Sequence, residues 1–146
     1  MDETLAERSY ELVWLIRRLF RSMAREADRY LEAIGISVAD RAVMEFLYPD
    51  KQLSVPEIAS RYDVSRQHVQ VTANRLLDRG LMNSMPNPRH KRSVLMRLSD
   101  TGRAVFAGIR HNEDELLERL FVDVDRQDLE ATRQTLRTML DKLNQE

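Results

Sequence analysis

Residues 5–34 form one uninterrupted amphipathic stretch, which constrains the fold more than any other feature of the sequence. Apolar residues recur there at three- and four-residue steps from Leu5 to Ile34, and neither Gly nor Pro occurs before Gly35. This spacing predicts one long helix that ends at Gly35. At about 1.5 Å per residue, such a helix outreaches the core of a small domain. We therefore expect part of its apolar face to pack against a second subunit.

Capping residues and turn signals divide the rest of the chain into shorter elements. Ser37, Ser54 and Ser65 stand where N-terminal caps are expected, and Asp63 tolerates the left-handed backbone of a tight turn. The apolar spacing predicts helices at 38–48, 55–61, 66–79, 100–119 and 126–144, and strands at 81–85 and 93–98. Residues 86–92 are polar and rich in Pro, which predicts a loop. The expected fold class is mainly α (α+β), with about six helices and one β-hairpin.

Basic residues are concentrated in the middle of the chain. The 146 residues have a formal net charge of −1, but residues 61–103 contain nine basic and three acidic residues, a local net charge of +6. Residues 1–60 carry −3 and residues 104–146 carry −4. Such an asymmetry is typical of a nucleic-acid-binding surface between acidic flanks. The chain has no Cys, which excludes a thiol nucleophile, a disulfide and a Cys-type zinc site.

The helices at 55–61 and 66–79, joined by a tight turn, predict a helix-turn-helix with a basic hairpin, or wing, after it. The exposed face of the second helix carries Arg, Gln and Asn, which read guanine and adenine edges in the major groove. The basic hairpin tip is suited to the phosphate backbone. The candidate DNA-binding residues are Ser65, Arg66, Gln67, His68, Gln70, Asn74 and Arg75 in the helix, and Arg89, Lys91 and Arg92 in the wing.

Four segments carry a family resemblance: 54–59, 74–81, 86–88 and 90–102. Together they resemble the multiple-antibiotic-resistance regulator (MarR) family of winged-helix transcription factors. The last segment is similar to the family's wing signature, although the family usually has Asp where this chain has His90 and Arg where it has Ser84. The resemblance covers essentially the whole chain. It implies a single MarR-like domain over 1–146, a winged helix-turn-helix at 37–100, and dimerisation helices at 1–36 and 101–146.

The resemblance implies a homodimer that binds pseudo-palindromic double-stranded DNA and represses transcription until a small aromatic or phenolic ligand releases it. The pocket residues that it suggests are Trp14, Arg17, Arg18, Tyr30, Met44 and Phe46. Two alternatives remain open: a winged-helix DNA-binding protein that needs no effector, and a protein–protein adaptor that has kept the fold.

An enzyme is not expected, because the sequence has no Gly-rich phosphate loop and no convincing pair of catalytic carboxylates. We expect no cofactor and no metal, since His111, Asp114 and Glu115 form only a weak ligand set on one helix. The acidic N-terminus lacks the apolar core of a signal peptide, and no apolar run reaches the ~18 residues of a membrane span. The expected location is the cytoplasm.

Overall fold

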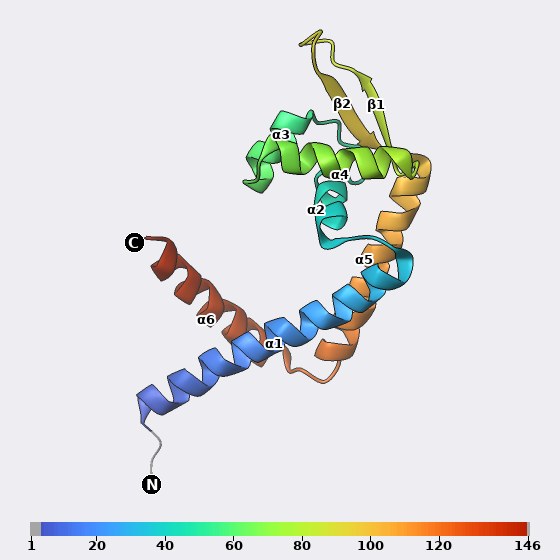
Figure 1. Ribbon diagram of the computed structural model, residues 1–146. Helices are drawn as coiled ribbons and strands as arrows, with labels where there is room; N and C mark the ends of the chain where they lie inside the picture. The colour runs from blue at the N-terminus through green and yellow to red at the C-terminus, as the bar shows by residue number, and fades with distance from the viewer. Residues whose placement is uncertain (1–3, 146) are drawn as a thin grey trace. The chain divides into compact units, whose positions relative to one another are not determined.

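The computed structural model describes residues 4–145, and the chain divides into two compact units between His111 and Asn112. The first unit holds five helical elements and an antiparallel hairpin (Figure 1). The second holds the end of α5 and all of α6. The elements are α1 (Leu5–Ile34), α2 (Val38–Leu47), α3 (Val55–Tyr62), α4 (Arg66–Asp78), β1 (Met82–Pro86), β2 (Val94–Leu98), α5 (Asp100–Phe121) and α6 (Arg126–Asn144).

Local capping explains most helix boundaries. The expected caps at Ser37 and Ser54 are confirmed, and each forms a reciprocal capping box with the residue three positions later. Gly35 ends α1 with φ 69°, and Asp63 adopts the expected left-handed conformation with φ 56°. The helix expected at 38–48 ends one residue earlier, because Tyr48 precedes Pro49 and takes an extended backbone.

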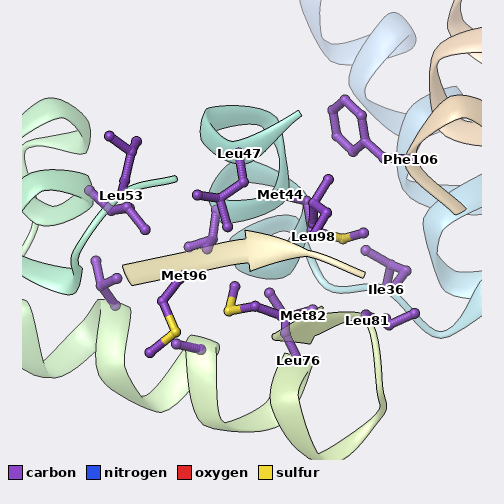
Figure 2. Close-up of a cluster of buried hydrophobic side chains, with 14 of the residues drawn as sticks. Ile36, Met44, Leu47, Leu53, Leu76, Leu81, Met82, Met96, Leu98 and Phe106 are labelled. Carbon is purple, nitrogen blue, oxygen red and sulfur yellow. The ribbon is translucent and has the colours of Figure 1, made fainter. Parts of the chain in front are cut away.

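The core of the first unit lies between α2, α4 and the hairpin (Figure 2). Met82, Met96 and Leu76 lie between the hairpin and α4, whereas Met44 and Leu47 lie on the α2 side. All five are at most 2% exposed. The hairpin is therefore packed on both sides at its base, which fixes where its tip projects.

One element of the sheet was not expected from the sequence. Leu53, just before α3, pairs with Met96 of β2 through two backbone hydrogen bonds of 3.1 and 2.7 Å. This bridge joins the helix-turn-helix to the hairpin. The strands themselves begin and end within one residue of their predicted bounds, and Met82 pairs with Leu98 at the base.

The first turn of α5 lies directly on the start of β1, and Gly102 permits this approach. A Cβ at Gly102 would lie 1.9 Å from the carbonyl oxygen of Leu81, closer than any real contact allows. One turn further along, Phe106 is fully buried, with its ring 4.8 Å from that of Tyr48. The close approach at Gly102 thus lets α5 place Phe106 in the core.

The two long terminal helices contrast with this core. In α1 the only buried residue is Leu31, and α6 has none. Exposed large apolar residues of α1 include Leu12, Leu15, Leu19 and Phe20, and those of α6 are Leu129, Leu136, Leu140 and Leu143. Among the described residues, no helix has the length and apolar character that crossing a membrane requires.

Candidate nucleic-acid interface

Helix α4 has one buried face and one exposed face, as the helix-turn-helix prediction requires. Val69, Ala73 and Leu76 have no exposed surface and hold α4 against α2 and α3. The opposite face carries exposed polar side chains: Arg66, Gln67, Gln70 and Asn74. We call these four residues, together with Val71, the readout face.

The start of α4 is held by local contacts. The Ser65 hydroxyl accepts a hydrogen bond from the backbone N–H of His68 at 3.0 Å, which makes Ser65 the N-cap. The His68 ring lies 6.4 Å from the Tyr62 ring, and Tyr62 in turn lies 5.8 Å from Phe46 of α2. Ser65 and His68 are therefore exposed and also stabilise the N-terminal end of α4.

A hydrogen bond organises the middle of the readout face. The Gln70 side-chain amide donates to the Asn74 carbonyl oxygen at 2.9 Å, across one helical turn. This bond limits the rotamers of both side chains. Each amide keeps a further donor or acceptor for another partner, because each carries two donors and an acceptor oxygen.

Val71 is the one residue of the readout face that the sequence did not mark as a DNA-binding candidate. Its side chain is 50% exposed in the middle of polar neighbours. It lies three and four residues from Asn74 and Gln67, on the same side of the helix. Apolar side chains in this setting contact the methyl group of thymine. The sequence signal for Val71 is that an apolar residue stands outside the stripe of buried apolar residues in α4.

A hollow of about 430 Å³ lies where the starts of α3, α4 and β2 meet. Arg66, Gln67 and Gln70 line it from α4, and Arg92 lines it from the wing. The structure thereby brings together predicted residues that are far apart in the sequence. Two guanidinium groups on one hollow suit an anion such as a phosphate group.

The wing loop is ordered by Asn87. Its side-chain amide donates to Ser93 Oγ at 3.0 Å, and its carbonyl oxygen accepts from the backbone N–H of Arg89 at 3.0 Å. The side chains of Arg89, His90 and Lys91 are exposed around this frame. The predicted wing residues therefore lie at the tip of the hairpin, apart from Arg92 at the hollow.

Three of the nine basic residues in 61–103 are tied into the fold. Arg75 pairs with Asp40, Arg79 donates to the carbonyl oxygen of Gly35, and Arg103 pairs with Asp100. Within residues 4–145, the other six make no side-chain hydrogen bond or ion pair; they are Arg61, Arg66, Arg89, Lys91, Arg92 and Arg97. Six of the nine basic side chains are thus available to bind an external partner, whereas Arg75 is already paired with Asp40.

The six predicted ligand residues do not gather in one place within a single chain. Trp14, Arg17 and Arg18 are exposed on α1, with the Arg18 guanidinium 4.5 Å above the Trp14 ring. Tyr30 follows Trp14 by 16 residues in the same helix, a distance of roughly 24 Å, and its side chain is half-buried. Met44 and Phe46 are in α2 rather than in α1.

Met44 is fully buried in the core, so it packs against other apolar side chains rather than lining an open pocket. Phe46 is half-buried beside Tyr62. Among the described residues, no group of three or more His, Asp or Glu side chains could hold a metal ion.

No protein-family model matches the chain. An uncharacterized protein of Mycobacterium tuberculosis is 40% identical over 97 residues, which are 66% of this chain and 68% of that protein. An HTH-type transcriptional regulator of Bacillus subtilis, YkoM, is 28% identical over 101 residues, covering 69% of this chain and 66% of that one.

Solved structures share the whole fold. A MarR family transcription regulator, SP03579, has a TM-score of 0.82 at 24% identity, over 97% of this chain and 95% of its own. A Staphylococcus aureus MepR variant bound to an oligodeoxyribonucleotide has a TM-score of 0.69 at 20% identity, over 90% and 97%. The first of these neighbours is described as a MarR family transcription regulator, and the second as bound to DNA. The chain therefore belongs to one family with the mycobacterial protein, and its fold is that of the MarR-family winged-helix regulators.

Proposed function

We propose that this chain is a DNA-binding transcriptional regulator that acts as a homodimer on pseudo-palindromic sites. The observation that carries the proposal is the shared hollow, where Arg66 and Gln67 of α4 meet Arg92 of the wing. Such a surface combines base-reading side chains with phosphate-binding ones. The MepR variant of the same fold that is bound to an oligodeoxyribonucleotide supports DNA as the partner.

The major-groove contacts come from the readout face, with Ser65 and His68 at its N-terminal end. Gln67, Gln70 and Asn74 contact base edges, and Arg66 contacts a guanine or a phosphate. Backbone N–H groups at the start of α4 point the same way and favour an anion. In the wing, Arg89, Lys91 and Arg92 bind the flanking backbone.

The exposed apolar faces of α1 and α6 support the homodimer. Half-exposed or more open apolar side chains recur along both helices, for example Leu15, Leu19 and Leu140. Contiguous apolar surface of this kind marks an interaction site. A second copy of the chain covers it and sets two recognition helices on one DNA face. Two-fold symmetry then demands half-sites roughly 10 base pairs apart or a multiple of that.

Selection of bound sequences from a random duplex library tests the proposal directly. We expect enrichment of a motif with dyad symmetry and the half-site spacing given above. A triple variant, Arg66→Ala, Gln67→Ala and Arg92→Ala, serves as the control and should enrich no motif, although it keeps the buried face of α4 intact. Failure of the native protein to enrich any sequence would favour the protein–protein adaptor.

The regulatory part of the proposal is repression that a small aromatic or phenolic ligand relieves. Its support is the sequence resemblance, together with the exposed Trp14 and Arg18 pair on α1. Since Trp14 and Tyr30 lie roughly 24 Å apart along α1, a pocket holding both groups of residues needs a second chain. Calorimetry with a panel of aromatic acids, with and without bound DNA, tests it. A DNA complex that no compound perturbs would instead indicate the effector-independent regulator.

A further inference from the structure

The C-terminal half of α4 is joined to the corner between α1 and α2 by two arginine side chains. Arg75 donates from Nη2 and Nε to one carboxylate oxygen of Asp40, at 2.8 and 3.2 Å. Arg79 donates to the carbonyl oxygens of Gly35 and Ile34. These contacts span 35 to 45 residues of sequence, so they hold separate elements together. We call this pair of contacts the arginine clasp.

Asp40 is the buried partner of the clasp. Its side chain is 5% exposed, and its second carboxylate oxygen accepts the backbone N–H of Ser37 at 3.1 Å. A buried carboxylate is stable only when charge and hydrogen bonds compensate for its lost hydration. Arg75 provides the only side-chain cation paired with Asp40 among the described residues. Moving Arg75 onto DNA would leave that carboxylate buried without its counter-charge.

Arg79 acts at the end of α1. The last carbonyl groups of a helix lack partners within the helix and carry partial negative charge. Gly35 terminates α1 in the left-handed conformation, and a Cβ there would lie 3.5 Å from Arg79 Nη2. The guanidinium group therefore covers the end of α1 at close range, and α4 cannot shift relative to α1 without breaking these bonds.

We propose that Arg75 and Arg79 are positioning residues that fix the recognition helix to the α1–α2 corner, and that Arg75 does not contact DNA. This inference rests on the proposed DNA-binding function. It departs from the sequence-based assignment, which places Arg75 with the base-reading residues. Because α1 is the proposed dimer helix, the clasp makes the separation of the two recognition helices depend on the dimer arm.

Salt-dependent DNA binding separates positioning from contact. A phosphate-contacting arginine contributes about 1 to the slope of log affinity against log salt, whereas a positioning residue contributes none. We would measure this slope for Arg75→Met, Asp40→Asn and their combination, using the selected DNA site. Arg66→Met, on the readout face of the same helix, is the matched control. Urea unfolding of every variant confirms that the protein is folded at the assay temperature.

We expect Arg75→Met and Asp40→Asn each to weaken binding by about tenfold with an unchanged salt slope. The double variant should be no weaker than either single variant, because both remove the same contact. Arg66→Met should reduce the slope by about 1. A reduced slope in Arg75→Met, or losses that multiply in the double variant, would overturn the inference. So would native affinity in Asp40→Asn.

Arg75→Lys keeps the test decisive if Asp40→Asn fails to fold. Lysine retains the charge that a phosphate contact needs but lacks the fork that reaches Asp40 through two nitrogens. We expect it to lose affinity as Arg75→Met does; retention of native affinity would assign Arg75 to DNA. A native protein that binds no DNA would instead defeat the proposed function and leave the clasp a feature of folding alone.

Discussion

Two regions of the molecule differ in how they cover their apolar side chains. One is the winged-helix region, whose core extends from Leu31 to Ile109, and the other is the pair of helical arms, α6 and the part of α1 before Leu31. Among the described residues, every buried hydrophobic side chain lies between Leu31 and Ile109. The earlier part of α1 and the whole of α6 bury none. The winged-helix region thus completes its core within one chain, whereas the arms leave apolar stripes exposed, which the proposed homodimer would cover.

Local helix signals are equally good in both regions, so they do not explain this contrast. In α1, Thr4 and Glu7 form a capping box, and the Thr4 hydrogen bonds hold the pKa of Glu7 below its usual value. In α6, Asp125 caps the N–H groups of Gln127 and Asp128. The helices of the core carry the same type of cap. The two regions differ in tertiary packing. Of the four predictions that follow, the first two probe that difference and the last two concern the DNA-binding surface of the winged-helix region.

The largest effect is expected in the core. Phe106→Ala removes a fully buried ring and should lower the free energy of unfolding by about 3–5 kcal/mol. The loss should be the same at every protein concentration, because the cavity lies within one chain. Urea unfolding at several concentrations measures it. Val94→Ala, at a position 45% exposed, is the control and should cost well under half as much.

A substitution in the arms should instead weaken dimerisation. Leu140→Glu puts a charge on the apolar stripe of α6, where the leucine is 60% exposed in one chain. Burying a leucine is worth roughly 1.5–3 kcal/mol, and a symmetric dimer loses it twice, so dimerisation should weaken about 100-fold or more. Sedimentation across concentrations measures the shift. Thr138→Glu on the opposite face should leave the dimer intact; equal effects of both variants would refute the arm assignment.

The wing should affect DNA binding without affecting either the core or the dimer. Arg92→Ala removes a cation from the hollow shared with Arg66. Affinity should fall by about tenfold or more for all sequences alike, and the salt slope should fall by about 1. Fluorescence anisotropy at several salt concentrations would measure both. An unchanged slope would show that Arg92 makes no phosphate contact.

The smallest effect concerns Val71. If its half-exposed side chain covers a thymine methyl group, replacing that thymine with deoxyuridine should weaken binding by about fourfold, since one buried methyl is worth about 0.8 kcal/mol. In Val71→Ala the same DNA substitution should have little effect. A scan of deoxyuridine through the selected site measures this for both proteins. Equal losses in both would remove Val71 from the readout.

Much of the fold could be predicted because its signals are local. The bounds of α1 and α6 agree with the prediction at both ends, and those of the other elements differ by one or two residues at one end or both. Capping boxes join residues three positions apart, as at Ser54 and Glu57, so a reader of the sequence can find them. The exposed face of α4, including Val71, was also predictable from its helical period, although Val71 was not predicted to contact DNA.

Long-range contacts could not be read in the same way. The bridge between Leu53 and Met96 and the pair formed by Asp40 and Arg75 each join residues far apart in the chain. Nothing in the residues near Arg75 distinguishes it from Arg66. The position of Met44 in its helix is likewise compatible with either a core or a pocket wall, and only the neighbouring side chains in the structure show that it lies in the core.

Helix ends, helix faces and the concentration of basic charge in 61–103 follow from the amino-acid order, because capping bonds and amphipathic periods act over three or four residues. The packing of α2 against α4 decides which of those charges are already used. It buries Asp40 beside Arg75, brings Arg79 to the end of α1, and leaves Arg66 and Arg92 together at an open hollow. A charge becomes a structural tie or a binding group according to what folding places beside it.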